Sequence, residues 1–430
     1  MSLHAGVLVT GTEVLTGRVV DRNGPWCSER LRELGVEHET TVVVGDRPAD
    51  MMSALEWLRE EGCAVIVTSG GLGPTADDLT AQVVGEFQGR PMVLDAALET
   101  RIAAILERLT RRWPDVDLEA VREGNRKQAT IPEGSTILEP VGTAPGLVVP
   151  PAAGDGPTVV VLPGPPRELK PMWEAAISTP AFREAIAGGE EIRQEMLRLF
   201  GIPESEIAET LRSAAGDGID LDAMEITTCM RRGEIEIVTR YPPAGHDDYA
   251  AFADYVARRH GDRLFSTDGS SVDAQVAERL RDRSLTIAVA ESCTGGLIGA
   301  RLTERPGSSE YFAGGVLAYS NEAKVALAGV DPATLDAHGA VSPEVAGELA
   351  AGARERLDAD IGVGVTGVAG PTGGTQAKPV GTVCFAVSGP GGTVERTIHL
   401  PGSREDVRDR STTVALHLVR LYLAGSAPDW

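Results

Sequence analysis

The sequence has few aromatic residues and fewer basic than acidic ones, and both shortages narrow the range of functions. Only 4% of the 430 residues are aromatic, which argues against a surface that stacks bases or sugars. Acidic residues outnumber basic ones by 63 to 40, so the net charge is −23. Such a chain repels a phosphate backbone. We therefore expect no nucleic-acid partner, and any anionic substrate must be small and held by local N–H groups, an Arg or Lys, or a metal.

Cysteine pairs and long apolar runs are also missing. The five cysteines are far apart, with no Cys-x-x-Cys and no matching His pair: Cys27, Cys63, Cys229, Cys293 and Cys384. This spacing argues against a disulfide framework or structural zinc and fits a reducing cytosol. Neither a basic and apolar leader nor an apolar run of about 18 residues occurs. The sequence predicts a cytoplasmic protein with no membrane partner.

The length and the pattern of segments predict three domains of α/β and α+β type. A chain of 430 residues, 42% of them hydrophobic, is long enough for two or three cores. Strand-like and helix-like segments alternate in residues 1–175, a β-α-β-β-α order follows in 176–268, and a second α/β pattern occupies 269–425. Alternation of this kind predicts a mainly parallel sheet with helices on both faces.

In the first domain, polar and glycine-rich loops follow four predicted strands. Because ligands bind beyond the carboxyl ends of such strands, these loops predict a site. They are residues 10–13, 45–46, 69–78 and 163–168. Glycines in the third loop let N–H groups surround phosphate oxygens, and Asp77 and Asp78 could hold a divalent cation. Turns need glycine in any case, and no Gly-x-x-x-x-Gly-Lys-Ser/Thr loop is present.

The last domain opens with the apolar run 285–290, followed by Glu291-Ser292-Cys293-Thr294-Gly295-Gly296 and a helix-forming segment, 297–304. This order predicts a strand, a tight turn and a helix N-terminus. Ser292 would then lie where backbone N–H groups can hold an oxyanion. The alternative is that Ser292 and Thr294 only cap the helix.

A lysine downstream is the candidate partner of Ser292. Ser320 or Asn321 is a plausible N-cap, which places Lys324 in the first turn of the next helix. The helix dipole and burial would both lower the lysine pKa, and a neutral amine can take a proton from serine. A solvated lysine is the alternative. Gly-x-Ser-x-Gly is absent, three isolated histidines offer no triad base, and Cys293 lacks a His partner: the histidines are His338, His399 and His417.

Long motifs in the first domain resemble the amino-terminal domain of the CinA family. They are Gly11-Thr12-Glu13, residues 68–80 (TSGGLGPTADDLT), 125–129 (NRKQA) and 162–169 (LPGPPREL). The resemblance implies a doubly wound, molybdopterin-binding-like sheet with ADP-ribose pyrophosphatase activity that depends on a divalent metal (Mg, Mn or Co). It implies metal ligands at Asp77 and Asp78. The implied nucleotide-binding residues are Gly11, Glu13, Asp46, Gly70, Gly71, Gly73, Arg167 and Lys170.

The last domain resembles the carboxy-terminal CinA domain in residues 290–296 (AESCTGG), 319–324 (YSNEAK) and 364–371 (GVTGVAGP). The resemblance implies hydrolysis of the carboxamide of nicotinamide mononucleotide, without a cofactor. Ser292 would be the nucleophile and Lys324 its base, and Tyr319 would assist proton transfer or orient the lysine. The implied substrate-binding residues are Gly295, Gly296, Ser309, Asn321, Thr366, Gly367, Gly370 and either Arg404 or Arg408.

The middle module resembles the KH-like insert of the family, but it lacks a Gly-x-x-Gly clamp, so we interpret it as a spacer or dimerisation module. Two other functions remain open. One is a protein that holds a pterin or nucleotide without turning it over. The other is an interaction protein in competence or DNA damage, the roles that gave the family its name. The resemblance also suggests a homodimer.

Overall fold

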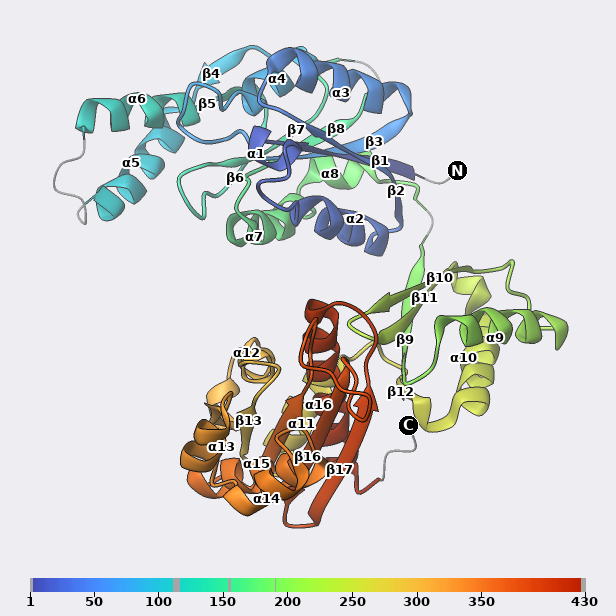
Figure 1. The fold of residues 1–430 in the computed structure, drawn as a ribbon. Helices are drawn as coiled ribbons and strands as arrows, with labels where there is room; N and C mark the ends of the chain where they lie inside the picture. Colours follow the sequence, from blue (N-terminus) through green and yellow to red (C-terminus); the bar gives the residue numbers. More distant parts are fainter. Residues whose placement is uncertain (1–2, 111–116, 154–155, 190, 427–430) are drawn as a thin grey trace. The chain divides into compact units, whose positions relative to one another are not determined.

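The computed structural model describes residues 3–110, 117–153, 156–189 and 191–426. The chain divides into two compact units, residues 1–193 and 194–430 (Figure 1). The predicted α/β class is confirmed.

The first unit is a six-stranded sheet in the order β2-β1-β3-β8-β7-β6. The four strands from β2 to β8 are parallel, while β7 and β6 are antiparallel to their neighbours. Its elements are β1 (Leu3–Thr10), α1 (Thr12–Leu15), α2 (Asn23–Glu33), β2 (Val36–Val44), α3 (Pro48–Glu60), β3 (Cys63–Ser69), α4 (Thr80–Phe87), β4 (Met92–Leu94), α5 (Ala96–Thr110), α6 (Leu118–Gln128), β5 (Thr130–Pro132), β6 (Thr136–Leu138), β7 (Gly146–Val149), β8 (Thr158–Leu162), α7 (Pro166–Ala176) and α8 (Pro180–Ala185).

Alternate residues of the central strands supply two cores, one on each face of this sheet. In β3, Val65 and Val67 belong to the core beneath α2, α7 and α8, whereas Ile66 belongs to the core beneath α3, α4 and α5 (Figure 1). Both faces of the sheet are therefore buried, which explains why β8 (Thr158–Leu162) is an almost continuous apolar run. The predicted parallel sheet with helices on both faces is confirmed, and only its antiparallel edge departs from the prediction.

The second unit contains two sheets. Its elements are β9 (Arg193–Phe200), α9 (Glu204–Gly216), β10 (Glu225–Arg231), β11 (Glu234–Tyr241), η1 (Pro243–Gly245), α10 (His246–His260), η2 (Gly261–Arg263), β12 (Leu264–Ser266), α11 (Val272–Asp282), β13 (Ile287–Glu291), α12 (Leu297–Thr303), η3 (Ser308–Glu310), β14 (Phe312–Leu317), α13 (Asn321–Ala328), α14 (Pro332–His338), α15 (Pro343–Arg356), β15 (Ile361–Gly367), β16 (Thr382–Gly389), β17 (Gly392–His399) and α16 (Arg404–Ala424). The four-stranded sheet has the order β10-β11-β9-β12, and the five-stranded sheet has the order β14-β13-β15-β16-β17. In the larger sheet, β14, β13 and β15 are parallel and β16 and β17 are antiparallel.

The small module, β9 to β12, has a core of its own and also contributes to the core of the larger sheet. The ring of buried His417, on α16, stacks on Phe200 with 3.8 Å between ring centroids and meets the edge of Phe265 at 4.6 Å. Both phenylalanines come from the small module, so the middle segment packs as part of the same unit as the last one. The junction between the units also differs from the predicted boundary at residue 175. Phe182, on α8, is buried in the core of the first unit, so that unit extends to residue 193.

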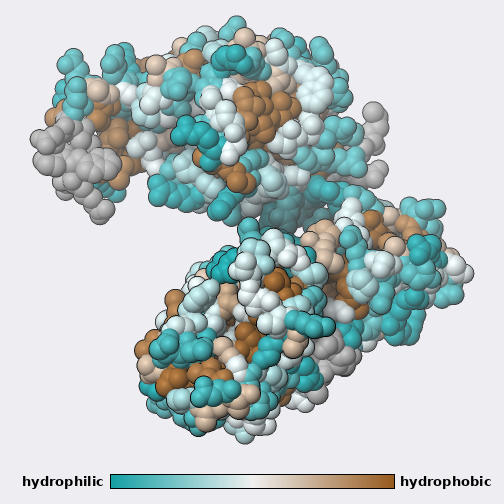
Figure 2. Space-filling model, viewed as in Figure 1, coloured by the Kyte–Doolittle hydropathy of each residue, from teal (hydrophilic) through white to brown (hydrophobic). Residues whose placement is uncertain are grey.

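Polar residues cover most of the visible face of each unit, and apolar residues form separate patches on it (Figure 2). No described helix has both the length and the apolar character needed to cross a membrane.

Candidate active sites

The predicted serine and lysine lie together in the second unit. Ser292 follows β13 directly and is 7% exposed, and its N–H donates to the carbonyl of Val365 on β15 at 3.0 Å. Lys324 is in the first turn of α13, whose N-cap Ser320 accepts a hydrogen bond from the N–H of Ala323 at 3.1 Å. The lysine is 2% exposed, and its Nζ lies 3.1 Å from Ser292 Oγ. Strand β13 and the cap of α13 thus bring the two side chains into hydrogen-bond contact.

Burial favours a neutral Lys324, and its hydrogen-bond partners are compatible with one. Its Nζ also donates to the carbonyls of Ala318 and Tyr319, both at 3.0 Å. Carbonyl oxygens only accept hydrogen bonds, so a neutral amine uses both N–H groups on them and keeps its lone pair for the hydroxyl of Ser292. Burial lowers the pKa of Lys324, against a smaller opposing effect of Cys293. The amine therefore has the geometry and the shift in pKa that a general base needs.

The N-terminus of α12 is not free to hold an oxyanion, contrary to the expectation from the sequence. Glu291 is 1% exposed, and its carboxylate accepts hydrogen bonds from the N–H groups of Gly296, Ile298 and Gly299 at 2.9, 3.1 and 2.8 Å. The glutamate caps the helix and fixes the turn that carries Ser292. The backbone N–H groups of residues 293–295, within the turn, are the ones that follow Ser292 directly.

Cys293 is a poor rival nucleophile. Its side chain is buried, and this burial raises the pKa of the thiol to about 12. The reactive thiolate is therefore scarce near neutral pH.

Ser292 opens into a cavity of about 220 Å³. The cavity is lined by Ser292, Cys293, Tyr319, Ser320, Asn321, Lys324, Ala340, Val341, Thr366, Gly367, Ala369 and Arg404. The residues that sequence reasoning missed are Ser320, Ala340, Val341 and Ala369. Thr366 Oγ1 donates to the carbonyl of Ala340 at 2.7 Å, which ties the 340–341 loop to the end of β15. Nothing in the local sequence of 340–341 indicated this contact.

The structure separates the two candidate arginines. Arg404 lines the cavity and donates to the carbonyl of Gly370 at 2.9 Å, and its Nη2 lies 3.3 Å from the phenol oxygen of Tyr319. Arg408 donates instead to the carbonyls of Cys293 and Thr294 at 3.2 and 3.0 Å. Arg404 is thus placed at the cavity, whereas Arg408 braces the turn that carries Ser292.

Several predicted substrate residues lie outside the lining of this cavity. Gly295 and Gly296 adopt positive φ values of 61° and 96° and shape the turn before α12. Gly370 contributes the carbonyl that holds Arg404. Ser309 is exposed in η3 and does not reach the cavity. The phenol of Tyr319 is directed to Arg404 rather than to Lys324. The contact of Tyr319 with the lysine is made by its main-chain carbonyl.

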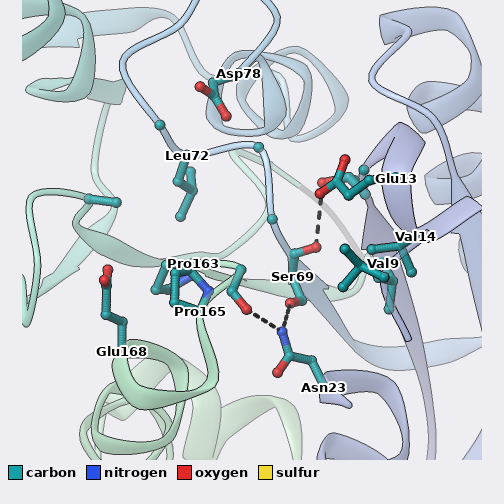
Figure 3. A pocket seen from close by; sticks show the side chains of 18 of the residues that line it. Val9, Glu13, Val14, Asn23, Ser69, Leu72, Asp78, Pro163, Pro165 and Glu168 are labelled. Carbon is teal, nitrogen blue, oxygen red and sulfur yellow. Dashed lines mark hydrogen bonds between the residues drawn. The ribbon is translucent and has the colours of Figure 1, made fainter. Parts of the chain in front are cut away.

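In the first unit, the carboxyl-end loops enclose a cavity of about 830 Å³ (Figure 3). Asn23 fixes two of these loops, because its side-chain N–H group donates to Ser69 Oγ at 2.8 Å and to the carbonyl of Gly164 at 2.6 Å. The predicted residues Gly11, Glu13, Asp46, Gly70, Gly71, Gly73, Asp77 and Asp78 all line this cavity. The structure adds Thr10, Asp21, Arg22, Asn23, Gln128 and Glu168 to the polar lining.

The predicted phosphate contacts Arg167 and Lys170 do not line this cavity. The side chain of Arg167 is 86% exposed, and Lys170 Nζ lies 5.5 Å from the centre of the Trp26 ring. They are three residues apart on α7, so they share one face of that helix, while Glu168 points to the cavity (Figure 3). Both residues belong to α7 rather than to the preceding loop, so the helical period sets their direction.

The donor set of this cavity suits a cation that is shared with phosphates. Its charged lining consists of Arg22 and six carboxylates: Glu13, Asp21, Asp46, Asp77, Asp78 and Glu168. Asp77 and Asp78 accept hydrogen bonds from the hydroxyl of Thr75, which lowers the pKa of Asp77. Within the described ranges, no three His, Cys, Asp or Glu side chains converge to hold a metal ion by themselves. Magnesium sites often use one or two carboxylates and complete the shell with substrate phosphates and water, and this lining fits that arrangement.

Comparisons with known proteins cover both units. The chain matches a family described as the CinA C-terminal domain over residues 269–423 and one described as a probable molybdopterin binding domain over residues 6–184. A CinA-like protein of Mycobacterium marinum is 58% identical over 428 residues, with 99% of each chain covered. A CinA-like protein of Mycobacterium tuberculosis is 56% identical over 429 residues, covering 99% of this chain and 98% of the relative. The crystal structure of the competence/damage inducible protein CihA from Agrobacterium tumefaciens is 36% identical over 36% of this chain and 97% of that one, with a TM-score of 0.34.

Proposed function

Since this chain belongs to the CinA family, we propose that its second unit hydrolyses the carboxamide of nicotinamide mononucleotide to nicotinate mononucleotide and ammonia. The observation that carries the proposal is the contact of 3.1 Å between Ser292 Oγ and the buried Nζ of Lys324. Two carbonyls occupy the other hydrogen-bonding directions of the amine. A serine hydroxyl next to such an amine is suited to attack an amide.

The reaction proceeds in two halves. Lys324 takes the proton of Ser292 as Oγ attacks the carboxamide carbon, and N–H groups of the 293–295 turn hold the oxyanion. The C–N bond then breaks, and the lysine gives its proton to the leaving nitrogen, which departs as ammonia. Water next attacks the ester on Ser292 while Lys324 accepts its proton. The ester bond breaks as Lys324 returns this proton to Ser292 Oγ, and the free carboxylate leaves.

The cavity supports a phosphorylated substrate. Arg404 contributes a guanidinium to its lining, a group whose planar donors match a phosphate. Tyr319 lies against Arg404 at 3.3 Å and orients it. Arg404 is therefore the residue that we assign to the substrate phosphate.

Ammonia release from nicotinamide mononucleotide tests the proposal. Ser292→Ala and Lys324→Met should each lower the rate by orders of magnitude and leave the thermal midpoint nearly unchanged. Ser308→Ala, outside the cavity, is the matched control and should keep full activity. Full ammonia release by Ser292→Ala would refute the nucleophile.

For the first unit we propose a metal-dependent ADP-ribose pyrophosphatase, on the strength of its acid-rich cavity. Asp77 and Asp78 would hold the cation together with the substrate phosphates. A bound cation neutralises the charge of the pyrophosphate and makes its phosphorus atoms easier to attack. Gly70, Gly71 and Gly73 let the backbone approach the phosphates closely.

Product analysis separates the two proposals. Asp78→Asn should remove AMP formation from ADP-ribose in the presence of Mg²⁺ or Mn²⁺ and leave ammonia release from the second unit intact. Wild-type protein that binds ADP-ribose without forming products would instead identify the first unit as a nucleotide-binding module.

A further inference from the structure

A second polar cavity, of about 500 Å³, lies within the second unit, between the β10–β11 hairpin and helices α11 and α12. It is lined by Arg198, Arg231, Arg232, Glu234, Glu236, Ser271, Asp273, Arg301, Glu304, Arg305 and Pro306. These include five arginines in a chain whose net charge is −23. None of the lining residues belongs to the cavity of Ser292.

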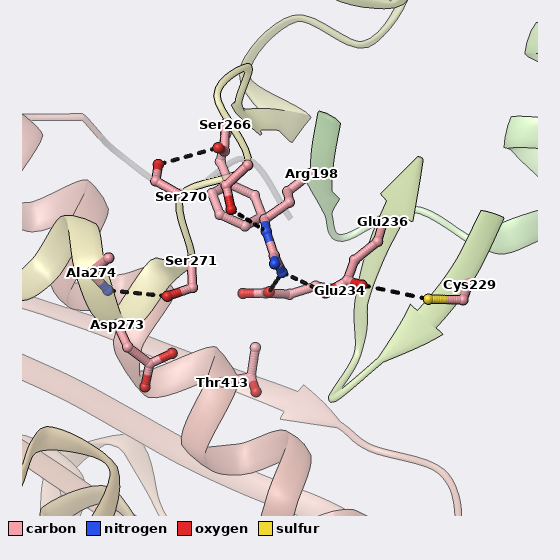
Figure 4. Close-up of polar contacts among 12 residues, drawn as sticks. Arg198, Cys229, Glu234, Glu236, Ser266, Ser270, Ser271, Asp273, Ala274 and Thr413 are labelled. Atoms are coloured by element: carbon pink, nitrogen blue, oxygen red, sulfur yellow. Dashed lines mark hydrogen bonds and ion pairs between the residues drawn. The ribbon is translucent and has the colours of Figure 1, made fainter. Parts of the chain in front are cut away.

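Two of the five arginines, Arg198 and Arg301, are paired with carboxylates of the lining, and Figure 4 shows the contacts of Arg198. Arg198 donates to Glu236 at 2.6 Å and lies 3.6 Å from Glu234. Arg301 donates to both oxygens of Asp273 at 2.9 and 2.6 Å and to the hydroxyls of Thr412 and Thr413. Both side chains are at least 86% buried, so their charges are already neutralised by the carboxylates beside them.

The other three lining arginines are available to contact a ligand. Within the described part of the chain, Arg231, Arg232 and Arg305 form no ion pair or side-chain hydrogen bond, and all three are exposed. Of the four carboxylates in the lining, Glu304 is the one that does not contact Arg198 or Arg301. Three guanidinium groups therefore face one cavity with one carboxylate to balance them.

The backbone at Arg232 supports a functional role. Arg231 pairs with Glu234, so Arg232 and Gly233 form a two-residue hairpin turn, with φ values of 54° and 84°. Two positive φ angles define a type I′ turn, in which Asn-Gly is strongly preferred. An arginine at the first position is disfavoured by its Cβ, and such outliers gather at functional sites. The turn lies close to α16, because a Cβ at Gly233 would be 3.7 Å from Arg410 Cγ.

We propose that this cavity binds the phosphate of a small phosphorylated molecule through Arg231, Arg232 and Arg305. Guanidinium groups match phosphate oxygens in pairs. The volume fits a small molecule, and the net charge of the chain repels a long polyanion. Because Arg305 follows α12 and the other two belong to the hairpin, the ligand would bridge the small module and the domain that carries Ser292.

Titration calorimetry of the full chain with inorganic pyrophosphate tests the site. EDTA is included in the buffer, because it removes divalent cations and so prevents metal-dependent binding of pyrophosphate in the first unit. Arg232→Asn is the key variant, because it creates the Asn-Gly turn that suits the hairpin. It should weaken pyrophosphate binding about tenfold or more while the thermal midpoint stays the same or rises. Arg305→Ala, on a different element, should weaken binding to a similar extent.

Two controls define the result. Arg283→Ala, an exposed arginine outside the cavity, and Ser292→Ala should both bind pyrophosphate as the wild type does. Wild-type protein that binds no pyrophosphate at millimolar concentration would overturn the proposal. So would binding that survives both Arg232→Asn and Arg305→Ala but is lost in Arg404→Ala, because the anion would then occupy the Ser292 cavity. Tighter binding of a single-stranded RNA through the same arginines would overturn the small-molecule assignment.

Discussion

Lys324 combines a buried amine with three polar neighbours, and its charge state decides whether Ser292 can be activated. Two of the neighbours are carbonyls and the third is the serine hydroxyl. A charged lysine would donate its three N–H groups to these neighbours and would have no lone pair to accept the serine proton. Activity therefore requires the deprotonated amine.

This requirement predicts a rate that rises with pH. Burial lowers the pKa of Lys324 from 10.5, so the neutral fraction grows as pH rises toward the shifted value and levels off above it. The value of kcat/KM for ammonia release should follow the same curve, with its midpoint below 10.5. Lys324→Arg, which stays charged, should lose about 10²–10⁴-fold at every pH. A flat profile for the wild type would contradict the lysine base.

The two arginines of α16 should differ in which kinetic constant they affect. Arg404 lines the cavity, so Arg404→Ala should mainly raise KM for nicotinamide mononucleotide. Arg408 holds the carbonyls of Cys293 and Thr294, so Arg408→Ala should mainly lower kcat. Steady-state kinetics of the two variants would show the split. The reverse pattern would exchange their roles.

Local sequence was informative for the residues that sit on strand ends and helix caps. Ser292 follows an apolar strand and Lys324 follows a capping Ser320, so both could be placed from short-range signals. Arg404 and Arg408 could not be separated, because both are on the same helix and only tertiary contacts distinguish them. Ala340 and Val341 were missed since they reach the cavity through a loop that has no period of its own.

At the scale of elements, the tight packing of α15 against its neighbours depends on glycine. A Cβ at Gly352 would lie 1.6 Å from the carbonyl oxygen of Ala328, at the end of α13. A Cβ at Gly347, on the same helix, would meet only the flexible carboxylate end of Glu395 at 2.6 Å. Backbone atoms cannot move aside as a side-chain end can.

The two glycines of α15 therefore form a matched pair. Helix propensity alone favours alanine by about 1 kcal/mol at either position. Gly352→Ala should nonetheless destabilise the protein by about 1–3 kcal/mol, because overpacking against the carbonyl outweighs that gain. Gly347→Ala should be neutral or stabilising. Chemical denaturation followed by circular dichroism would measure both, and equal effects would show that the close approach is relieved cheaply.

Most of the long helices and central strands could be predicted from apolar periodicity, whereas the short elements could not. The strands β4, β5 and β6 have three residues each, and α1 has four, which is too short for any period to show. Arg167 and Lys170 lie outside the cavity for another reason. Their loop continues into α7 at Pro166, and the helical turn directs them away from the cavity.

At the scale of the whole molecule, a buried polar pair joins the small module to the last domain in the second unit. Glu234 Oε1 lies 2.8 Å from His417 Nε2, and Arg420 Nε donates to His417 Nδ1 at 3.3 Å. Since Nδ1 accepts, a neutral His417 carries its proton on Nε2 and donates it to Glu234. Burial lowers the pKa of His417 well below its ordinary value and raises that of Glu234 to about 7.

This pair makes the stability of the second unit depend on pH in a defined direction. Glu234 titrates near 4.5 when unfolded and near 7 when folded, so between these values only the folded chain holds the proton. Its stabilising contribution is complete below 4.5 and falls as pH rises to about 7. His417 acts in the opposite sense, because its contribution is lost as pH falls below its ordinary 6.5.

Comparison with Glu234→Gln isolates the glutamate. The variant cannot ionise at this position, whereas His417 is present in both proteins. Relative to Glu234→Gln, the wild type should therefore lose on the order of 3 kcal/mol between pH 4.5 and pH 7.5, from a shift of about 2.5 pKa units at 1.36 kcal/mol each. Thermal unfolding of both proteins across this range would measure it. A constant difference between them would mean that Glu234 does not change its protonation there.

The lysine clamp, formed by the two carbonyls that hold Nζ of Lys324, has a consequence for how this protein tolerates genetic change. The carbonyls of Ala318 and Tyr319 that hold Nζ belong to the main chain, so no codon change at 318 or 319 deletes either acceptor. Tyr319 is 65% exposed, and its side chain can vary without disturbing the clamp. Substitutions at the rim of the cavity, such as at Tyr319, can thus change which molecules enter it. The main-chain contacts that hold Lys324 stay the same.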